Sequence, residues 1–212
     1  MGITKIDETT IKDHYFLCED DSCYFFHTYT AYQVPWHNST NQLIYNFKIP
    51  PSKKDSKQWK YKLDAIKKIA ETLKNTIPPD VIKKATFIPI PPSKNRTDKE
   101  YDDRMVKTLL MAFERKADIQ DVLIQKKSML SSHKSEIRPS IDDLYNNLDI
   151  DNSICIGLKN NIILVDDVIT TGAHFKACKK RIKEFSPEAN ILGLFIARRE
   201  IIKDNENVFF GN

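Results

Sequence analysis

Apolar positions along the chain fall either into short continuous runs or into a spacing of three to four residues. The runs predict strands at 85–91, 122–124, 154–158, 162–165 and 191–197. The wider spacing predicts amphipathic helices at 57–73, 105–113, 140–148 and 175–185. Because strands alternate with helices, we expect an α/β fold with a mostly parallel, twisted sheet flanked by helices.

The first 50 residues differ from this pattern, because they carry many aromatic side chains and little helical spacing. Tyr15–Leu17 and Cys23–Phe26 predict short strands, and Gln42–Lys48 fits either a strand or a helical turn. We therefore expect an N-terminal extension, or hood, over residues 1–55. An α/β core over residues 56–212 would complete a single compact unit.

Composition limits the class of protein. Of the 212 residues 41% are hydrophobic and 29% charged, and no apolar run approaches the ~20 residues needed to span a bilayer. The first residues lack the apolar segment of a secretory signal. Free buried thiols at Cys155 and Cys178 would suit a cytoplasmic protein without a membrane partner. The net charge of +4 is compatible with a polyanionic ligand, but is too small to indicate nucleic acid by itself.

The most informative stretch is residues 162–174. The apolar run Ile162–Val165 leads into two carboxylates, Asp166 and Asp167, which we expect at a solvent-open strand end. A hydroxyl- and glycine-containing turn, Thr170–Gly172, follows and precedes a helix. Backbone N–H groups at such a turn can hold a phosphate, and adjacent carboxylates can accept hydrogen bonds from the two vicinal hydroxyls of a ribose. A strand whose acidic end merely caps a helix would account for one of these residues, but not for the whole run.

This run resembles the phosphoribosyl diphosphate (PRPP) motif of type I phosphoribosyltransferases. The resemblance implies a type I phosphoribosyltransferase fold and a PRPP site. The implied binding residues are Asp166, Asp167, Thr170, Thr171, Gly172, Ala173 and His174. Purine-salvage members carry an aspartate where Thr170 stands, so the sequence fits the orotate and ComF-like branches better. His174 replaces a usual hydroxyl residue of the phosphate loop, which is a departure from the family pattern.

A second loop, residues 88–96, resembles the Pro-x-Pro strand end of the ComF-like, competence-associated branch. There the resemblance implies a diphosphate site formed by Ser93, Lys94 and Arg96, with Arg104 as a displaced cation. It implies that Lys94 and Arg96 act in catalysis together with the two carboxylates. The alternative is that Lys94 and Arg96 are solvated surface charges of a loop, without a role in ligand binding.

Residues 126–139 are polar and basic, and resemble the mobile loop that closes over PRPP in these enzymes. His133, Lys134 and Arg138 would then face the ligand, whereas an ordinary surface loop is the equal alternative. ComF-like proteins often carry a four-cysteine zinc ribbon near their N-terminus. This chain has only Cys18 and Cys23 there, without the tight spacing of a closed zinc site, so we expect no zinc.

Three functions fit the sequence. The first is an enzyme that transfers the 5-phosphoribosyl group from PRPP, with Mg²⁺ held mainly by the ligand, to an acceptor that the sequence does not identify. The second is a non-catalytic module that senses PRPP or a nucleotide. The third is an effector that hydrolyses a nucleotide or ribose phosphate. Either alternative could serve DNA uptake or anti-phage defence with a nucleic-acid or protein partner, and a homodimer is compatible with all three.

Overall fold

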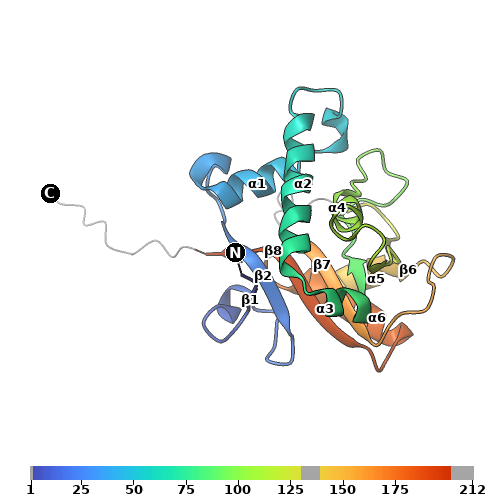
Figure 1. The fold of residues 1–212 in the computed structure, drawn as a ribbon. Coiled ribbons are helices and arrows are strands. Elements are labelled where there is room, and N and C mark those ends of the chain that lie inside the picture. Colours follow the sequence, from blue (N-terminus) through green and yellow to red (C-terminus); the bar gives the residue numbers. More distant parts are fainter. Residues whose placement is uncertain (1, 130–138, 202–212) are drawn as a thin grey trace.

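A six-stranded sheet forms the centre of the molecule (Figure 1). The computed structural model describes residues 2–129 and 139–201. The strand order is β1-β2-β8-β7-β3-β4, and every neighbouring pair is parallel except β1 with β2. The strands are β1 (Thr4–Lys5), β2 (Cys23–Thr30), β3 (Ala85–Pro89), β4 (Asp118–Ile119), β7 (Asn161–Ile169) and β8 (Asn190–Glu200). The expected α/β architecture with a mostly parallel sheet is therefore confirmed.

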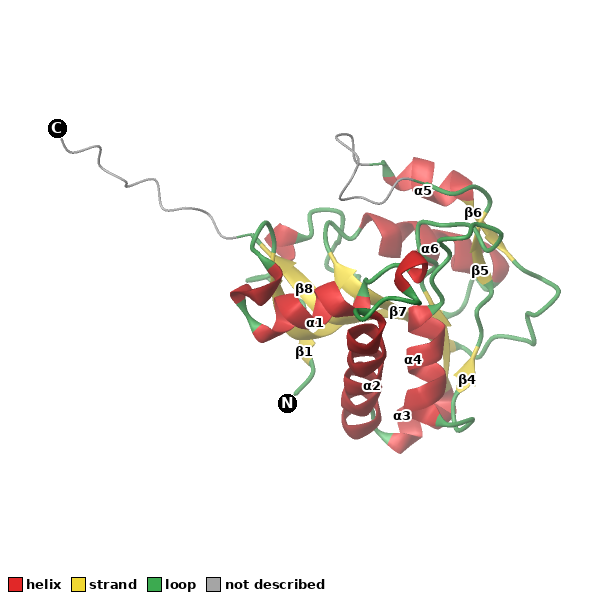
Figure 2. Cartoon of the chain, turned by 90° about the horizontal axis from the view of Figure 1, so that it is seen from above, coloured by secondary structure: helices red, strands yellow, loops and turns green. Residues whose placement is uncertain are grey.

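Helices cover both faces of the sheet, as the view from above shows (Figure 2). One face of the sheet is covered by α1, α2, α3 and α4, and the other face by α5 and α6. The helices are α1 (Ser39–Phe47), α2 (Trp59–Thr76), α3 (Pro79–Lys84), α4 (Arg104–Phe113), α5 (Ile141–Asn147) and α6 (Ala173–Phe185). Short 3₁₀ helices are η1 (Ile11–Asp13), η2 (Pro35–His37) and η3 (Pro51–Lys53).

Each face of the sheet has its own hydrophobic core. On the first face, Ile66 and Leu73 of α2 and Leu109 of α4 pack against Phe87 and Leu194 of the sheet. On the second face, the α6 side chains Phe175, Cys178 and Ile182 pack on Leu164 and Phe195. The spacing of these residues is the spacing that predicted the helices, because one stripe of each helix must face the sheet.

A small antiparallel sheet sits beside α6 and is made of β5 (Leu123–Gln125) and β6 (Leu148–Ile150). The strand expected at 154–158 is absent, since residues 151–160 have no strand in the structure. Ile156 is 85% exposed and Gly157 has a positive φ of 57°, so this run does not stay extended, although Cys155 and Leu158 pack against the second core. The strand expected at Tyr15–Leu17 is also wrong, because those residues form turns.

The N-terminal segment belongs to the main sheet and does not stand apart from it. Strand β2 pairs in parallel with β8 along its length, from Cys23 opposite Gly193 to Thr30 opposite Glu200. The ambiguous stretch Gln42–Lys48 lies mainly in helix α1. None of the helices in residues 2–129 and 139–201 combines the length and apolar character that crossing a bilayer requires.

Candidate functional site

The two loops singled out by the sequence meet at one edge of the sheet. The chain runs from β3 outward to β4, and then returns to the other side of β3 to form β7 and β8. The strand order therefore reverses between β3 and β7, which are parallel neighbours with Pro89 opposite Val165. In open α/β sheets, ligands bind outside the carboxyl ends of the strands at such a reversal. The loop after β3 and the loop after β7 both start there.

The loop after β7 has the geometry of an anion-binding turn. Strand β7 ends at Ile169, and Gly172 is the residue immediately before the 13-residue helix α6. Gly172 has φ of 87°, which a side chain would strain, and the hydroxyl of Thr171 accepts from the backbone N–H of Ala173 at 3.4 Å. The turn thus brings the N-terminus of α6, with its outward-pointing N–H groups, to the carboxyl edge of the sheet.

An N-terminal segment, residues 14–17, packs against this turn. The backbone N–H of Phe16 donates to the carbonyl of Thr171 at 3.0 Å, and Nδ1 of the fully buried His14 contacts the carbonyl of Thr170. A Cβ added to Gly172 would lie 2.8 Å from Cδ2 of Leu17. Sequence reasoning missed this support, because nothing in the spacing of residues 14–17 links them to a turn more than 150 residues away.

Asp167 is buried and ion-paired. Its side chain is 6% exposed, and its two oxygens lie 2.9 Å from Nζ of Lys48 and 2.6 Å from Nη2 of Arg104. Burial opposes ionisation of Asp167, but Lys48 and Arg104 outweigh it and hold its pKa well below the usual range. The expectation of a solvent-open carboxylate pair is therefore wrong for Asp167, which lies within β7.

The ion pairs extend from Asp167 into a buried chain of charges. Arg104, the first residue of α4, also pairs with Asp102 at 2.8 Å, and Asp102 accepts from Nζ of Lys62 at 2.7 Å. Lys62 is only 2% exposed and donates to the carbonyls of Phe47 and Ile49 at 2.9 and 2.8 Å. This charge network, Lys48–Asp167–Arg104–Asp102–Lys62, ties α1, α2 and α4 to the end of β7.

Asp166 occupies a different environment. Its side chain is half-buried on the strand that carries Asp167, and the backbone N–H of Asp167 donates to its Oδ1 at 2.7 Å. Burial and the adjacent charge of Asp167 raise the pKa of Asp166 to about 7. One carboxyl of the pair is thus fixed as an anion, while the other holds a proton near neutral pH.

His174 lies in the first turn of α6 and faces the small sheet. Its Nε2 is 3.3 Å from Nε2 of Gln125, at the end of β5. Burial lowers the pKa of His174 to about 4, so its imidazole is neutral at physiological pH. A neutral imidazole can donate one hydrogen bond, but brings no positive charge to an anion held by the turn.

The loop after β3 is tied down by contacts with the small sheet. Asn95 donates to the carbonyls of Gln125 and Lys126, and the backbone N–H of Met129 donates to the carbonyl of Ser93 at 2.7 Å. Arg96 pairs with Asp151 at 2.7 Å and with Asp121 at 3.0 Å. Lys94 is looser, since its ammonium lies 3.9 Å from Asp98.

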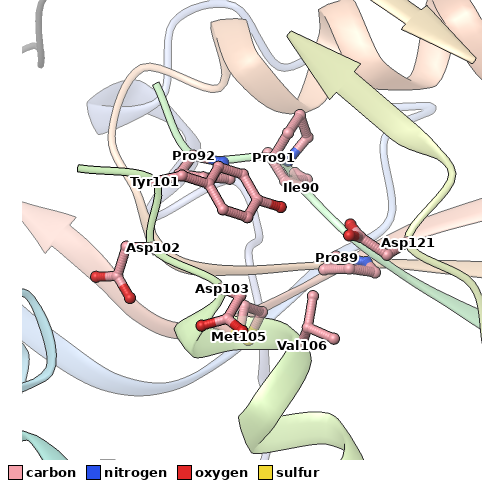
Figure 3. A pocket seen from close by; sticks show the side chains of 10 residues that line it. All are labelled: Pro89, Ile90, Pro91, Pro92, Tyr101, Asp102, Asp103, Met105, Val106 and Asp121. Carbon is pink, nitrogen blue, oxygen red and sulfur yellow. The ribbon is translucent and has the colours of Figure 1, made fainter. Parts of the chain in front are cut away.

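A small pocket opens between this loop and the start of α4 (Figure 3). Apolar groups of Pro89, Pro91 and Met105 form part of its wall, and the side chain of Tyr101 also lines it. The complete lining is Pro89, Ile90, Pro91, Pro92, Tyr101, Asp102, Asp103, Met105, Val106 and Asp121. Three of these residues are aspartates, and each is already paired with a cation: Asp102 with Lys62 and Arg104, Asp103 with Lys107, and Asp121 with Arg96.

The remaining predictions concern the second basic loop and zinc. His133, Lys134 and Arg138 lie outside the described residues.

Cys23 is buried in β2, where burial raises its pKa to about 12, whereas the exposed Cys18 has its Sγ 3.3 Å from Nζ of Lys176. Within residues 2–129 and 139–201, no group of three or more His, Cys, Asp or Glu side chains is arranged to hold a metal ion. Cys155, which we expected to be buried, is partly exposed.

Comparison with known proteins adds no relative. No protein-family model matches the chain, and no curated protein sequence matches it.

Proposed function

We propose that this chain binds PRPP with Mg²⁺, has a type I phosphoribosyltransferase-like fold, and transfers the 5-phosphoribosyl group to an acceptor with release of diphosphate. One observation carries the proposal. The two carboxylates lie in the last part of β7 and the Thr-Thr-Gly turn follows its carboxyl end, while the loop with Lys94 and Arg96 begins at the adjacent end of β3. Two anion-binding groups at one reversal of strand order suit a ligand that carries phosphate at both ends.

Each part of PRPP has a proposed partner. The 5-phosphate would lie on the turn Thr170–Gly172 and on the N-terminus of α6, where the first backbone N–H groups of a helix have no partner within the helix. The ribose diol would face Asp166, because Asp167 is already paired with two cations. In the reaction the acceptor's lone pair forms a bond to the anomeric carbon, while the bond from that carbon to the diphosphate oxygen breaks and magnesium neutralises the departing charge.

The diphosphate end has fewer unpaired cations than the resemblance implies. Arg96 already pairs with two carboxylates, and Arg104 pairs with Asp102 and Asp167. Lys94 is the most available of the three, because its nearest carboxylate is 3.9 Å away. The two arginines would have to exchange partners to bind diphosphate. This observation favours a second candidate function, a module that senses PRPP or a nucleotide without turning it over.

A ³¹P NMR experiment separates these functions. PRPP and Mg²⁺ are incubated with the protein, with and without a panel of purine and pyrimidine bases. Diphosphate that appears only when a base is present supports transfer. Release without a base indicates hydrolysis instead, and binding without release indicates sensing. Failure to bind PRPP in calorimetry at millimolar concentration would overturn the proposal.

Variants of the loop after β3 test the diphosphate assignment. A Lys94→Ala, Arg96→Ala double variant is expected to weaken PRPP binding by at least about tenfold, since a hydrogen bond to a charged group contributes ~1.5–3 kcal/mol. The same variant should bind ribose 5-phosphate normally, because that ligand lacks the diphosphate. Equal losses for both ligands would mean that this loop does not hold the leaving group.

A further inference from the structure

Positive charge is concentrated in one segment of the chain. Residues 53–68 contain seven lysines and two aspartates, a net charge of +5, whereas the whole chain carries +4. All the other residues together are therefore close to neutral, with a net charge of −1. A mildly basic protein of this kind has one strongly basic region and not a uniform excess of charge.

Six of these lysines lie on the surface. Lys62 is the exception, because it is buried in the charge network. Within the described parts of the chain, none of the six forms an ion pair. The exposed set, called here the lysine stripe, is Lys53, Lys54, Lys57, Lys60, Lys67 and Lys68.

The lysine stripe starts beside the candidate site. It covers the end of η3, the linker and the exposed side of α2, whose first turn lies near the carboxyl edge of the sheet (Figure 1). Two contacts fix this position: the backbone N–H of Ser52 donates to Glu100 at 3.4 Å, and Lys62 donates to Asp102. From there the stripe runs along the first half of α2 and ends at Lys68.

The chemistry of the stripe distinguishes between polyanionic partners. A basic amphipathic helix can lie on a membrane only if its apolar face is free to insert. The apolar face of α2 is buried against the sheet through Ile66, Ile69 and Leu73, which are each at most 3% exposed. The stripe can therefore act through its charges, and Tyr61, 46% exposed with Lys60 lying 4.9 Å from its ring centroid, adds an aromatic surface.

We propose that the lysine stripe binds the phosphate backbone of a nucleic acid. The helical part of the stripe, from Lys60 to Lys68, rises about 12 Å. Phosphates recur about every 3.4 Å along one strand of a duplex, so this part spans about four of them. An aromatic side chain among the lysines provides a surface on which an unpaired base can stack. This inference goes beyond the proposed function and does not rest on it.

Fluorescence anisotropy with labelled 20-nucleotide DNA and RNA, without PRPP, tests the proposal. Binding is expected at 50 mM salt, and should weaken steeply as salt rises. A Lys57→Gln, Lys60→Gln, Lys67→Gln, Lys68→Gln variant is expected to bind at least about tenfold more weakly. Its slope of log affinity against log salt should be smaller by about three, because each lost phosphate contact contributes about 0.7. Tyr61→Ala should weaken single-strand binding without changing that slope.

A matched control is available elsewhere on the surface. A Lys5→Gln, Lys12→Gln, Lys83→Gln, Lys116→Gln variant removes the same charge from four exposed lysines outside the stripe. It should retain most of the affinity. An equal loss in this control would mean that net charge alone drives binding and would overturn the proposal. So would no binding at 50 mM salt, or polyglutamate binding as tightly as the oligonucleotides, since that result would assign the stripe to an acidic protein.

Discussion

The two adjacent carboxylates are expected to respond in opposite ways to the same substitution. Asp167→Asn removes the anion that pairs with Lys48 and Arg104 inside the protein. Removing one member of a buried ion pair typically costs ~3–5 kcal/mol. Lys48 is 31% exposed and can turn toward water, and Arg104 keeps its pair with Asp102, so we expect the lower end, a loss of about 3 kcal/mol in the free energy of unfolding.

Asp166→Asn should leave the protein as stable as the wild type or make it more stable above pH 7. The pKa of Asp166 is about 7 in the folded protein and near 3.8 when unfolded. Between these values the folded state keeps a proton that the unfolded state has released, so the free energy of unfolding falls as pH rises.

Urea denaturation followed by circular dichroism at pH 5, 6, 7 and 8 measures both effects. Asp64→Asn, an exposed aspartate on α2, serves as a control that should change stability by less than ~0.5 kcal/mol. The Asp166→Asn variant should lose the component of stability that falls as pH rises between 5 and 7, and should keep the opposite component from the buried histidines. A stable Asp167→Asn variant together with a destabilised Asp166→Asn variant would refute the division between the two carboxylates.

Three other outcomes are expected. Gly172→Ala should lower the free energy of unfolding by ~2–3 kcal/mol in urea denaturation, because it adds a Cβ at positive φ against Leu17. Gly157→Ala, which has positive φ but open space, should lower it by only ~1 kcal/mol. Equal losses would contradict the contact between Gly172 and Leu17. Arg96→Ala should lower stability by ~1–2 kcal/mol and Lys94→Ala by less than ~0.5 kcal/mol, since only Arg96 bridges two carboxylates. Burial lowers the pKa of His14, His27 and His174, so the protein loses stability as pH falls below about 6.5 and the unfolded state takes up protons first. In the same titration, His14→Gln should lose less stability at low pH than the wild type. An unchanged profile would show that His14 is not the group responsible.

Sequence patterns predicted the elements whose cause is local. The spacing of Ile66 and Leu73 specified α2, and the apolar run before Asp166 specified the start of β7. The mostly parallel sheet followed from the alternation of strands and helices. These parts depend on residues within one or two turns of each other.

Ion pairs between residues far apart in the chain could not be predicted from the sequence. Nothing in the neighbourhood of Asp167 indicates that Lys48 and Arg104 neutralise it, because ion-pair partners have no characteristic spacing in sequence. The same holds for Arg96, whose partners Asp121 and Asp151 come from separate segments. A cation next to a strand end can serve a ligand or another side chain, and only the fold distinguishes the two.

The pairing of β2 with β8 determines when the molecule can finish folding. Cys23 lies opposite Gly193, so a strand made early in synthesis stays without this neighbour until a strand 170 residues later has left the ribosome. Contacts of such sequence separation are slow to form. Residues 14–17, which support the Thr170–Gly172 turn, reach it only through the same late step. A nascent chain therefore gains the contacts that support its Thr170–Gly172 turn at the end of folding, and incomplete chains lack them.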